Sequence, residues 1–345
     1  MDTITHFAAG ACIGELIAGH KLGKRAMVAG GFAQLVPDID FVFGMWMSPA
    51  ANAMAHRGLT HSILFLILIT PVLAWGVRRL WGDKAVPISF WIFFLGVEVL
   101  THLILDAFNA YGTGWFEPFS HLRVSFNAIF VADPFFSLPL GLALVLLLFT
   151  RSNFRWRNLI ATSALALSAT YLAYALYNKW QVERISNKVF ALHGIAPTSH
   201  FSTPTPFNSW LWYVVATDKN GSYVGYRSVL DQSNDIHFEF FPRNDSLIEE
   251  SSFNQEEIKT LKQLSQGHYT IEARADTLMF NDLRFGQMLG WQYPRNGFVF
   301  HFYLHPDLDN TLVLQRGRFE GWDYVAVKAF LRRILGNELP APPRE

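Results

Sequence analysis

Long apolar runs fill the first half of the chain and stop at about residue 180. Runs at 62–80, 87–105, 135–149 and 159–177 approach the length of about 20 residues that a spanning helix needs. Two shorter runs, 5–19 and 26–36, are rich in Gly and Ala, which let helices approach closely. We expect these two to form a hairpin inside the bundle, and residues 41–54 to lie at the interface. The first half is therefore predicted to be an all-α membrane bundle of four to six helices, spanning or re-entrant.

After about residue 182, charged residues return at ordinary density and no long apolar run remains. Segments rich in Trp, Tyr, Val and Phe predict strands at 209–217, 223–230, 236–241, 269–273, 298–304 and 311–315. Amphipathic patterns predict helices at 254–266 and 322–335. The chain is thus expected to consist of a membrane-embedded domain at 1–180 followed by a soluble α+β domain at 181–345.

Composition supports the membrane assignment and narrows the range of partners. Apolar residues make up 51% of the chain and charged residues only 16%, against about a quarter in ordinary globular proteins. The 28 basic and 28 acidic residues balance, so no basic excess indicates a nucleic acid as partner. The single cysteine excludes an intramolecular disulfide framework and a Cys-rich zinc site.

The basic residues predict which side of the membrane each loop faces. If the runs alternate across the bilayer, nine basic residues fall on one side: Lys21, Lys24, Arg25, Arg78, Arg79, Lys84, Arg151, Arg155 and Arg157. The positive-inside rule places that side in the cytoplasm. We therefore expect a multi-pass membrane protein whose C-terminal domain lies on the extracytoplasmic face, which is the periplasmic face if the membrane is a bacterial inner membrane.

Histidines and aspartates collect at the ends of the apolar runs, on the side opposite to these arginines. His102 and Asp106 are four residues apart and share one face of a helix, although a hydrogen bond anchoring the helix end explains the pair equally well. Imidazole nitrogens and carboxylate oxygens are ligands that zinc prefers. We predict a metal site on the periplasmic face with ligands drawn from His6, Asp38, Asp40, His56, His61, His102, Asp106, His121 and Asp133.

Several of these residues have simpler interpretations. Asp38 and Asp40 follow Pro37, and this segment taken alone is better explained as a turn in which aspartates cap the backbone. His56 and His61 fit an interfacial loop, and which of them is a ligand stays open. His121 fits an aqueous loop, and Asp133 fits the N-cap of a helix that begins with proline.

A dication at this position would polarise a phosphoryl or carbonyl oxygen and lower the pKa of a bound water. We expect one to three ions, zinc in the first place and manganese as the alternative. Asp38, Asp106 and Arg57 are the predicted catalytic residues. Arg57 is a candidate clamp for an anionic substrate group, and a contact with a lipid headgroup is its other interpretation.

Four segments together resemble a bacterial inner-membrane family known as membrane-bound metal-dependent hydrolases. They are Met1-Asp2-x-x-Thr5-His6, Pro37-Asp38-Ile39-Asp40, His56-Arg57-x-x-Thr60-His61-Ser62 and His102-x-x-x-Asp106, followed by Pro118-Phe119-Ser120 and Asp133-Pro134. The resemblance covers roughly residues 1–180. That family is in turn similar to zinc-dependent phospholipase C and the single-strand nucleases, which are all-helical enzymes with clustered zinc ions.

The resemblance implies that His6, Asp38, one of His56 or His61, His102 and Asp106 are ligands, with Asp106 bridging two ions. The chain departs from the phospholipase pattern in the later ligands, for which only His121 and Asp133 are available.

We therefore expect a membrane-bound hydrolase in which metal-activated water attacks an ester. A phosphoester is the preferred substrate, and a lipid-linked one suits the lipid bilayer in which the protein lies. The alternative is a non-catalytic, membrane-anchored binding or scaffold protein with a structural His/Asp site. The sequence determines neither the substrate, nor the role of the C-terminal domain, nor the oligomeric state.

Overall fold

A computed structural model describes residues 1–81, 86–249, 255–274, 277–304 and 319–337. The chain forms two compact units. The first contains Met1–Trp46, Ala55–Tyr174 and Pro206–Asn208, and the second contains Met47–Met54, Ala175–Thr205 and Ser209–Glu345. Each unit is described by itself below. Helix α7 (Arg157–Leu192) continues without a break through residue 180, where the sequence predicted the domain boundary.

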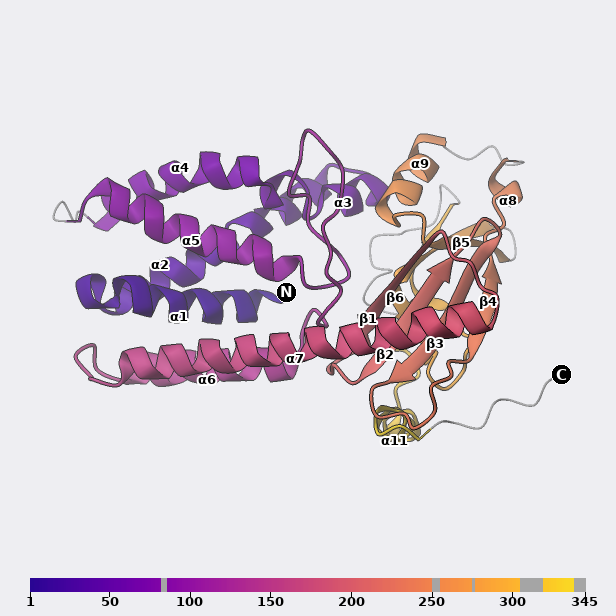
Figure 1. Cartoon of the computed structure of the whole chain (residues 1–345). Coiled ribbons are helices and arrows are strands. Elements are labelled where there is room, and N and C mark those ends of the chain that lie inside the picture. Colours follow the sequence, from indigo (N-terminus) through magenta and orange to yellow (C-terminus); the bar gives the residue numbers. More distant parts are fainter. Residues whose placement is uncertain (82–85, 250–254, 275–276, 305–318, 338–345) are drawn as a thin grey trace. The chain divides into compact units, whose positions relative to one another are not determined.

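The first unit is helical, as predicted (Figure 1). Its helices are α1 (Thr3–Leu22), α2 (Lys24–Leu35), α4 (Ile63–Trp81), α5 (Ile88–Asp106), α6 (Pro134–Phe149) and the first half of α7. Two 3₁₀ helices, η1 (Pro37–Met45) and η2 (Leu59–His61), follow α2 and precede α4, and the short helix α3 (Pro49–Ala55) lies between them in sequence.

Helices α1 and α2 form the predicted hairpin, and small residues permit its close packing. A Cβ atom on Gly10 would collide with the carbonyl oxygen of Gly30, and one on Gly14 would collide with that of Ala26. Helix α1 also packs against α5 and α6. This close contact between α1 and α2 therefore fixes the positions from which His6 and Gln34 face α5.

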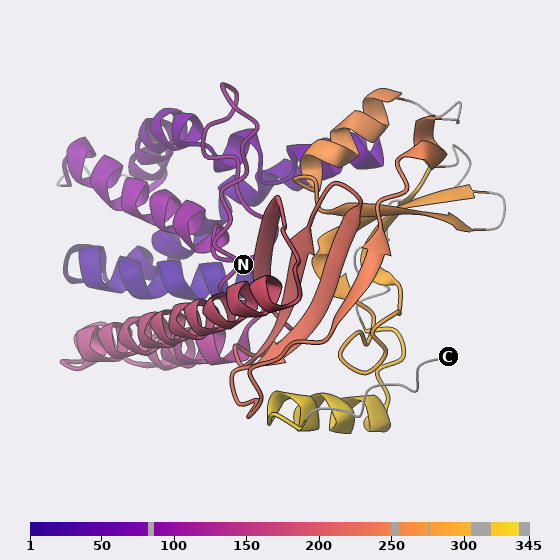
Figure 2. The same ribbon diagram turned by 45° about the vertical axis from the view of Figure 1, so that its right-hand side comes forward.

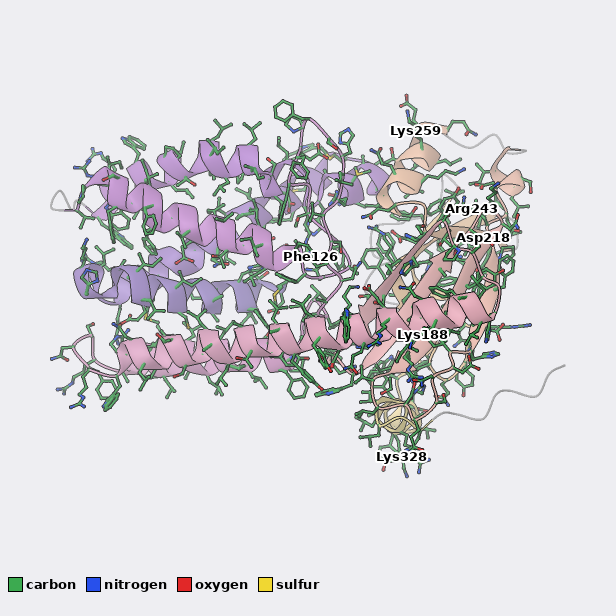
Figure 3. The ribbon with its side chains drawn as sticks, viewed as in Figure 1. Phe126, Lys188, Asp218, Arg243, Lys259 and Lys328 are labelled. Carbon is green, nitrogen blue, oxygen red and sulfur yellow. The ribbon has the colours of Figure 1, made fainter. Side chains whose placement is uncertain are left out.

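Three of the described helices are long and apolar enough to cross a membrane, namely α4, α5 and α7. They correspond to the predicted runs 62–80, 87–105 and 159–177. The fourth predicted span is an apolar helix, α6, but it has only 16 residues, which is about 24 Å at 1.5 Å per residue. Large apolar side chains of α4 and α6 are exposed, among them Leu68, Val72 and Leu142, and Figure 3 shows mostly carbon along these helices.

Most of the predicted basic side chains gather at one end of the first unit. The α1–α2 and α6–α7 turns lie together there, beside the last turn of α4 (Figure 1). Arg157 is an exception among the predicted cytoplasmic charges, because it is buried and paired with Glu15 through two contacts of 2.7 Å. Lys84 lies outside the described residues.

The second unit contains a four-stranded antiparallel sheet of order β1–β2–β3–β4. Its strands are β1 (Ser199–Pro204), β2 (Leu211–Thr217), β3 (Gly221–Ser228) and β4 (Phe238–Pro242). Side chains of β2 alternate between two buried faces. Trp212 and Val214 pack with the second half of α7, whereas Tyr213 and Val215 pack with residues of a second sheet. Figure 2 shows α7 on one face of this sheet.

The second sheet has the order β5–β6–β7, formed by β5 (Tyr269–Arg274), β6 (Thr277–Gln287) and β7 (Phe298–Tyr303). Helix α9 (Gln255–Leu264) packs on it, and α11 (Tyr324–Ile334) packs around Leu211 and Trp291. A four-residue helix, α8, spans Ser246–Glu249. The exposed side chains of Lys259 and Lys328 mark α9 and α11 in Figure 3. This unit confirms the predicted α+β class.

The sequence missed two strands of this unit, β1 and β6. Strand β1 is rich in Ser and Thr and ends with proline, so it lacks the apolar pattern of a strand. Strand β6 contains the buried ion pair Asp282–Arg284, whose charged atoms lie 2.6 Å apart. The strand predicted at 311–315 lies outside the described residues.

Candidate metal centre

Four side chains from three segments converge in the first unit. Asp38 comes from η1, His61 from η2, and His102 and Asp106 from α5, and one ligand atom of each lies within 4.8 Å of all the others. Pro37 begins η1 directly after α2, while the spacing of four residues places His102 and Asp106 on one face of α5. His61, His102 and Asp106 are fully buried, whereas 26% of the Asp38 side chain is exposed. Solvent therefore reaches this cluster at Asp38.

The distances in the cluster fit a single small cation. The Nε2 atoms of His61 and His102 are 3.1 Å apart. Asp38 Oδ1 lies 3.6 Å from each of these nitrogens, and Asp106 Oδ2 lies 3.4 Å from His61 Nε2 and 3.7 Å from His102 Nε2. Atoms that bind a tetrahedral zinc ion at 2.0–2.1 Å lie about 3.3 Å from each other. The four atoms thus have the spacing of a zinc-sized ligand set.

The chemistry of the donor atoms supports the same interpretation. Asp106 Oδ2 is buried and accepts no hydrogen bond from the described residues. Arg57 Nε lies 3.0 Å from it, which makes an ion pair although the N–H is not aligned for a hydrogen bond. The side chain of Arg57 is held by Asn109, which accepts a bond of 2.7 Å from Nη1, and by the ring of Tyr111. Carboxylate oxygens and imidazole nitrogens are the donor atoms that zinc and manganese prefer in proteins.

Asp40 lies beside the cluster but is not one of the four residues whose ligand atoms converge. Its Oδ2 accepts a hydrogen bond of 2.6 Å from the backbone N–H of Arg57 and one of 3.3 Å from Thr60 Oγ1, and it lies 3.6 Å from His61 Nδ1. Burial alone would raise the pKa of Asp40, but the hydrogen bond and charge of His56, with smaller contributions from His61 and the Arg57 N–H, hold it at about 2. Asp40 is therefore an ionised carboxylate beside His61, whose Nδ1 is itself within hydrogen-bond distance of Thr60 Oγ1, at 3.1 Å.

Arg57 has a left-handed backbone conformation, with φ +58°. Such a conformation is uncommon for residues other than glycine and is found preferentially at functional sites. The two hydrogen bonds that hold it are the one from its N–H to Asp40 and one of 2.8 Å from the Gly114 N–H to its carbonyl oxygen. These contacts direct the guanidinium inward, where it is almost fully buried.

A chain of buried hydrogen bonds leads from the cluster into the helices. Asp106 Oδ1 lies 2.9 Å from His6 Nε2 and also contacts the terminal nitrogen of Met1. His6 Nδ1 lies 3.2 Å from Gln34 Oε1, and Gln34 Nε2 donates a hydrogen bond of 3.2 Å to Glu98 Oε2. The His6 ring also stacks on that of His102, at 3.9 Å between centroids. His6 thus contacts the ligand Asp106 without belonging to the set of four.

The other predicted ligands lie elsewhere. His56 is 41% exposed and pairs with Asp40 at 3.2 Å, so of the two histidines of this segment only His61 joins the four. His121 is 58% exposed and lies 2.8 Å from Glu117. Asp133 caps α6, where it accepts hydrogen bonds from the Phe135 N–H and the Tyr171 hydroxyl. The structure therefore brings Asp38, His61, His102 and Asp106 together and leaves His56, His121 and Asp133 outside.

Sequence reasoning overlooked Gln34, Glu98 and Asn109. A signal for Glu98 was present, because Glu98, His102 and Asp106 follow one another at intervals of four residues in an otherwise apolar helix. An ionisable residue inside a spanning segment is rare and indicates function or a buried partner. Gln34 and Asn109 carry no comparable signal, since their roles follow from contacts with residues distant in the chain.

Comparison with known proteins places the first unit in a family. The family described as YdjM inner membrane protein matches residues 1–182. Inner membrane protein YbcI of Escherichia coli (strain K12) is 34% identical over 122 residues, which is 35% of this chain and 69% of that protein. The protein YfhP of Bacillus subtilis (strain 168) is 33% identical over 145 residues, but the match covers only 39% of this chain and 42% of YfhP. No solved structure matches the chain.

Proposed function

The chain belongs to the YdjM inner membrane protein family, and on that premise we propose that it is a membrane-bound, metal-dependent hydrolase of phosphoesters. The observation that carries the proposal is the convergence of Asp38, His61, His102 and Asp106 at the spacing of one zinc-sized ion. Zinc suits this mixture of imidazole and carboxylate ligands best, and manganese is the alternative.

A divalent ion in this ligand set would supply Lewis acidity toward a phosphoryl oxygen and lower the pKa of a water molecule. Asp38, Asp106 and the Arg57 guanidinium carry a net charge of −1, and a dication would change this sum to +1. The loaded site would therefore favour an anionic substrate. Asp38 marks the route of entry because it is the exposed member of the four. Arg57 would hold the anionic group of the substrate and stabilise the charge that develops during hydrolysis.

Hydrolysis of bis(p-nitrophenyl) phosphate by the purified protein tests the proposal. We expect activity with zinc or manganese and its loss on treatment with EDTA. Arg57→Lys is expected to lower kcat about 10²-fold or more, because lysine lacks the planar fork of arginine, while the metal content stays that of the wild type. Arg155→Lys, at the exposed basic end of the bundle, is the control and should leave kcat unchanged. Activity that survives both EDTA and Arg57→Lys would contradict the proposal.

We further propose that the cluster and the C-terminal domain face the periplasm. The basic side chains gather at the opposite end of the helical unit, which the positive-inside rule assigns to the cytoplasm. Helix α7 starts at that basic end and leads to the C-terminal domain. Alkaline phosphatase fused after Glu345 should therefore be active in cells, and the same enzyme inserted after Arg79 should be inactive. The reverse pattern would show that the orientation is wrong.

A further inference from the structure

The surroundings of Asp38 are apolar although the cluster itself is charged. Ile39 is 53% exposed, Phe41 is 72% exposed and Leu59 is 53% exposed. Ile4 and Ile63 are also exposed, each two residues from His6 or His61 in sequence. Large apolar side chains are therefore exposed in the same segments that carry the cluster residues. These segments suit an amphiphile whose polar group enters the cluster while its apolar part stays outside.

An apolar groove begins next to Asp38 in the chain. It has a volume of about 190 Å³ and is lined by Val28 and Phe32 of α2, by Val36 at the C-cap of α2, and by Leu73, Val77 and Trp81 of α4. Val36 directly precedes η1, the element that carries Asp38. Val28, Phe32 and Val36 are spaced by four, so they form one stripe of about 12 Å along α2 and its C-cap. The groove thus lies along α2 and α4, and its lining includes the residue just before η1.

The location of the groove identifies its occupant. Helix α4 is one of the helices long and apolar enough to cross a membrane, so the open side of the groove faces hydrocarbon. Apart from the Trp81 indole, the side chains that line it carry no polar atom. A hydrocarbon chain suits this environment, and Val36 brings the lining of the groove within two residues of Asp38 in the chain.

We propose that the groove holds an acyl chain of a phospholipid substrate while the phosphoester of the same molecule binds at Asp38 and Arg57. This inference rests on the proposed function and specifies its substrate class. It predicts that groove and cluster contribute separately to recognition. The groove would set the affinity for lipid, whereas the cluster would act on any phosphoester that reaches it.

Tryptophan substitutions that fill the groove provide the test. Val28→Trp and Val77→Trp would obstruct it from α2 and α4, and Val72→Trp is the matched control, because Val72 lies on α4, is 59% exposed and does not line the groove. The two substrates are phosphatidic acid in mixed micelles and p-nitrophenyl phosphate, which lacks acyl chains. We expect the groove variants to raise KM for phosphatidic acid at least tenfold and to leave hydrolysis of p-nitrophenyl phosphate and metal content unchanged. The control should behave as wild type.

Equal KM values for phosphatidic acid in the groove variants and in Val72→Trp would overturn the inference. A binding measurement separates this failure from a failure of the proposed function. Phosphatidic acid with a photoreactive group midway along an acyl chain should label residues 28–36 in nanodiscs, and Val28→Trp should suppress that labelling. Labelling without hydrolysis of phosphatidic acid, p-nitrophenyl phosphate or bis(p-nitrophenyl) phosphate would reject the hydrolase and retain the lipid groove. Hydrolysis of both substrates without labelling would retain the hydrolase and reject the groove.

Discussion

Replacing Asp106 by asparagine is expected to abolish stoichiometric binding of a divalent metal to the purified protein. The substitution keeps the size of the side chain but replaces the anionic oxygen that lies 3.4 Å from His61 Nε2 and 3.7 Å from His102 Nε2 with a neutral amide. Elemental analysis by mass spectrometry of detergent-purified protein measures the change. We expect about one zinc or manganese ion per chain in the wild type, and a small fraction of that in the variant.

His121→Asn is the control for this loss, because His121 is exposed and pairs with Glu117 outside the cluster. Its metal content should equal that of the wild type. Asp106 also contacts Arg57 and His6, so Asp106→Asn also disturbs a buried charge pair. His61→Gln, which leaves the Asp106–Arg57 pair in place, should lose the metal as well. Wild-type metal content in both cluster variants would show that these residues bind no ion.

Arg157→Met is expected to lower the free energy of unfolding by about 3–5 kcal/mol, because it leaves the buried carboxylate of Glu15 without its cation. Arg157 Nε and Nη2 each lie 2.7 Å from a different oxygen of Glu15, and both side chains are about 5% exposed or less. Nη1 of Arg157 also donates to the carbonyl oxygens of Leu147 and Thr150 at the end of α6. Thermal unfolding in detergent measures the effect.

The double variant Glu15→Met with Arg157→Met distinguishes the effect of the unpaired charge on stability from the effect of lost side-chain packing. Replacing both partners by apolar side chains removes the unpaired buried charge, so most of the lost stability should return. Arg295→Gln serves as the exposed control. Arg295 pairs with Glu239 at 3.1 Å but is 85% exposed, and surface pairs contribute about 0–1 kcal/mol. An Arg157→Met variant as stable as Arg295→Gln would show that the Glu15 carboxylate is not buried and charged.

Local patterns account for the parts of the fold that were predicted. Helices α4 and α5 follow from apolar runs of spanning length, and β2 follows from its run of aromatic and β-branched residues. Strand β6 was missed because Asp282 and Arg284 interrupt the apolar pattern of its strand. Their charges neutralise each other inside the domain, and that compensation is not visible in a local hydrophobic pattern.

The sequence by itself determined the helical and α+β halves, the bilayer as environment of the first half, and the donor chemistry of the candidate site. It included both Asp38 and Asp40 among the candidate ligands, and it left open which of His56 and His61 is a ligand. Tertiary structure decided that Asp38 and His61 face His102 and Asp106, while Asp40 and His56 pair behind them. The physical reason is the separation along the chain between the residues that interact. Helical periodicity acts over a few residues and can be read from the local sequence. The meeting of η1, η2 and α5 depends instead on packing between residues that are 23 (Asp38 to His61) to 68 (Asp38 to Asp106) positions apart in the chain.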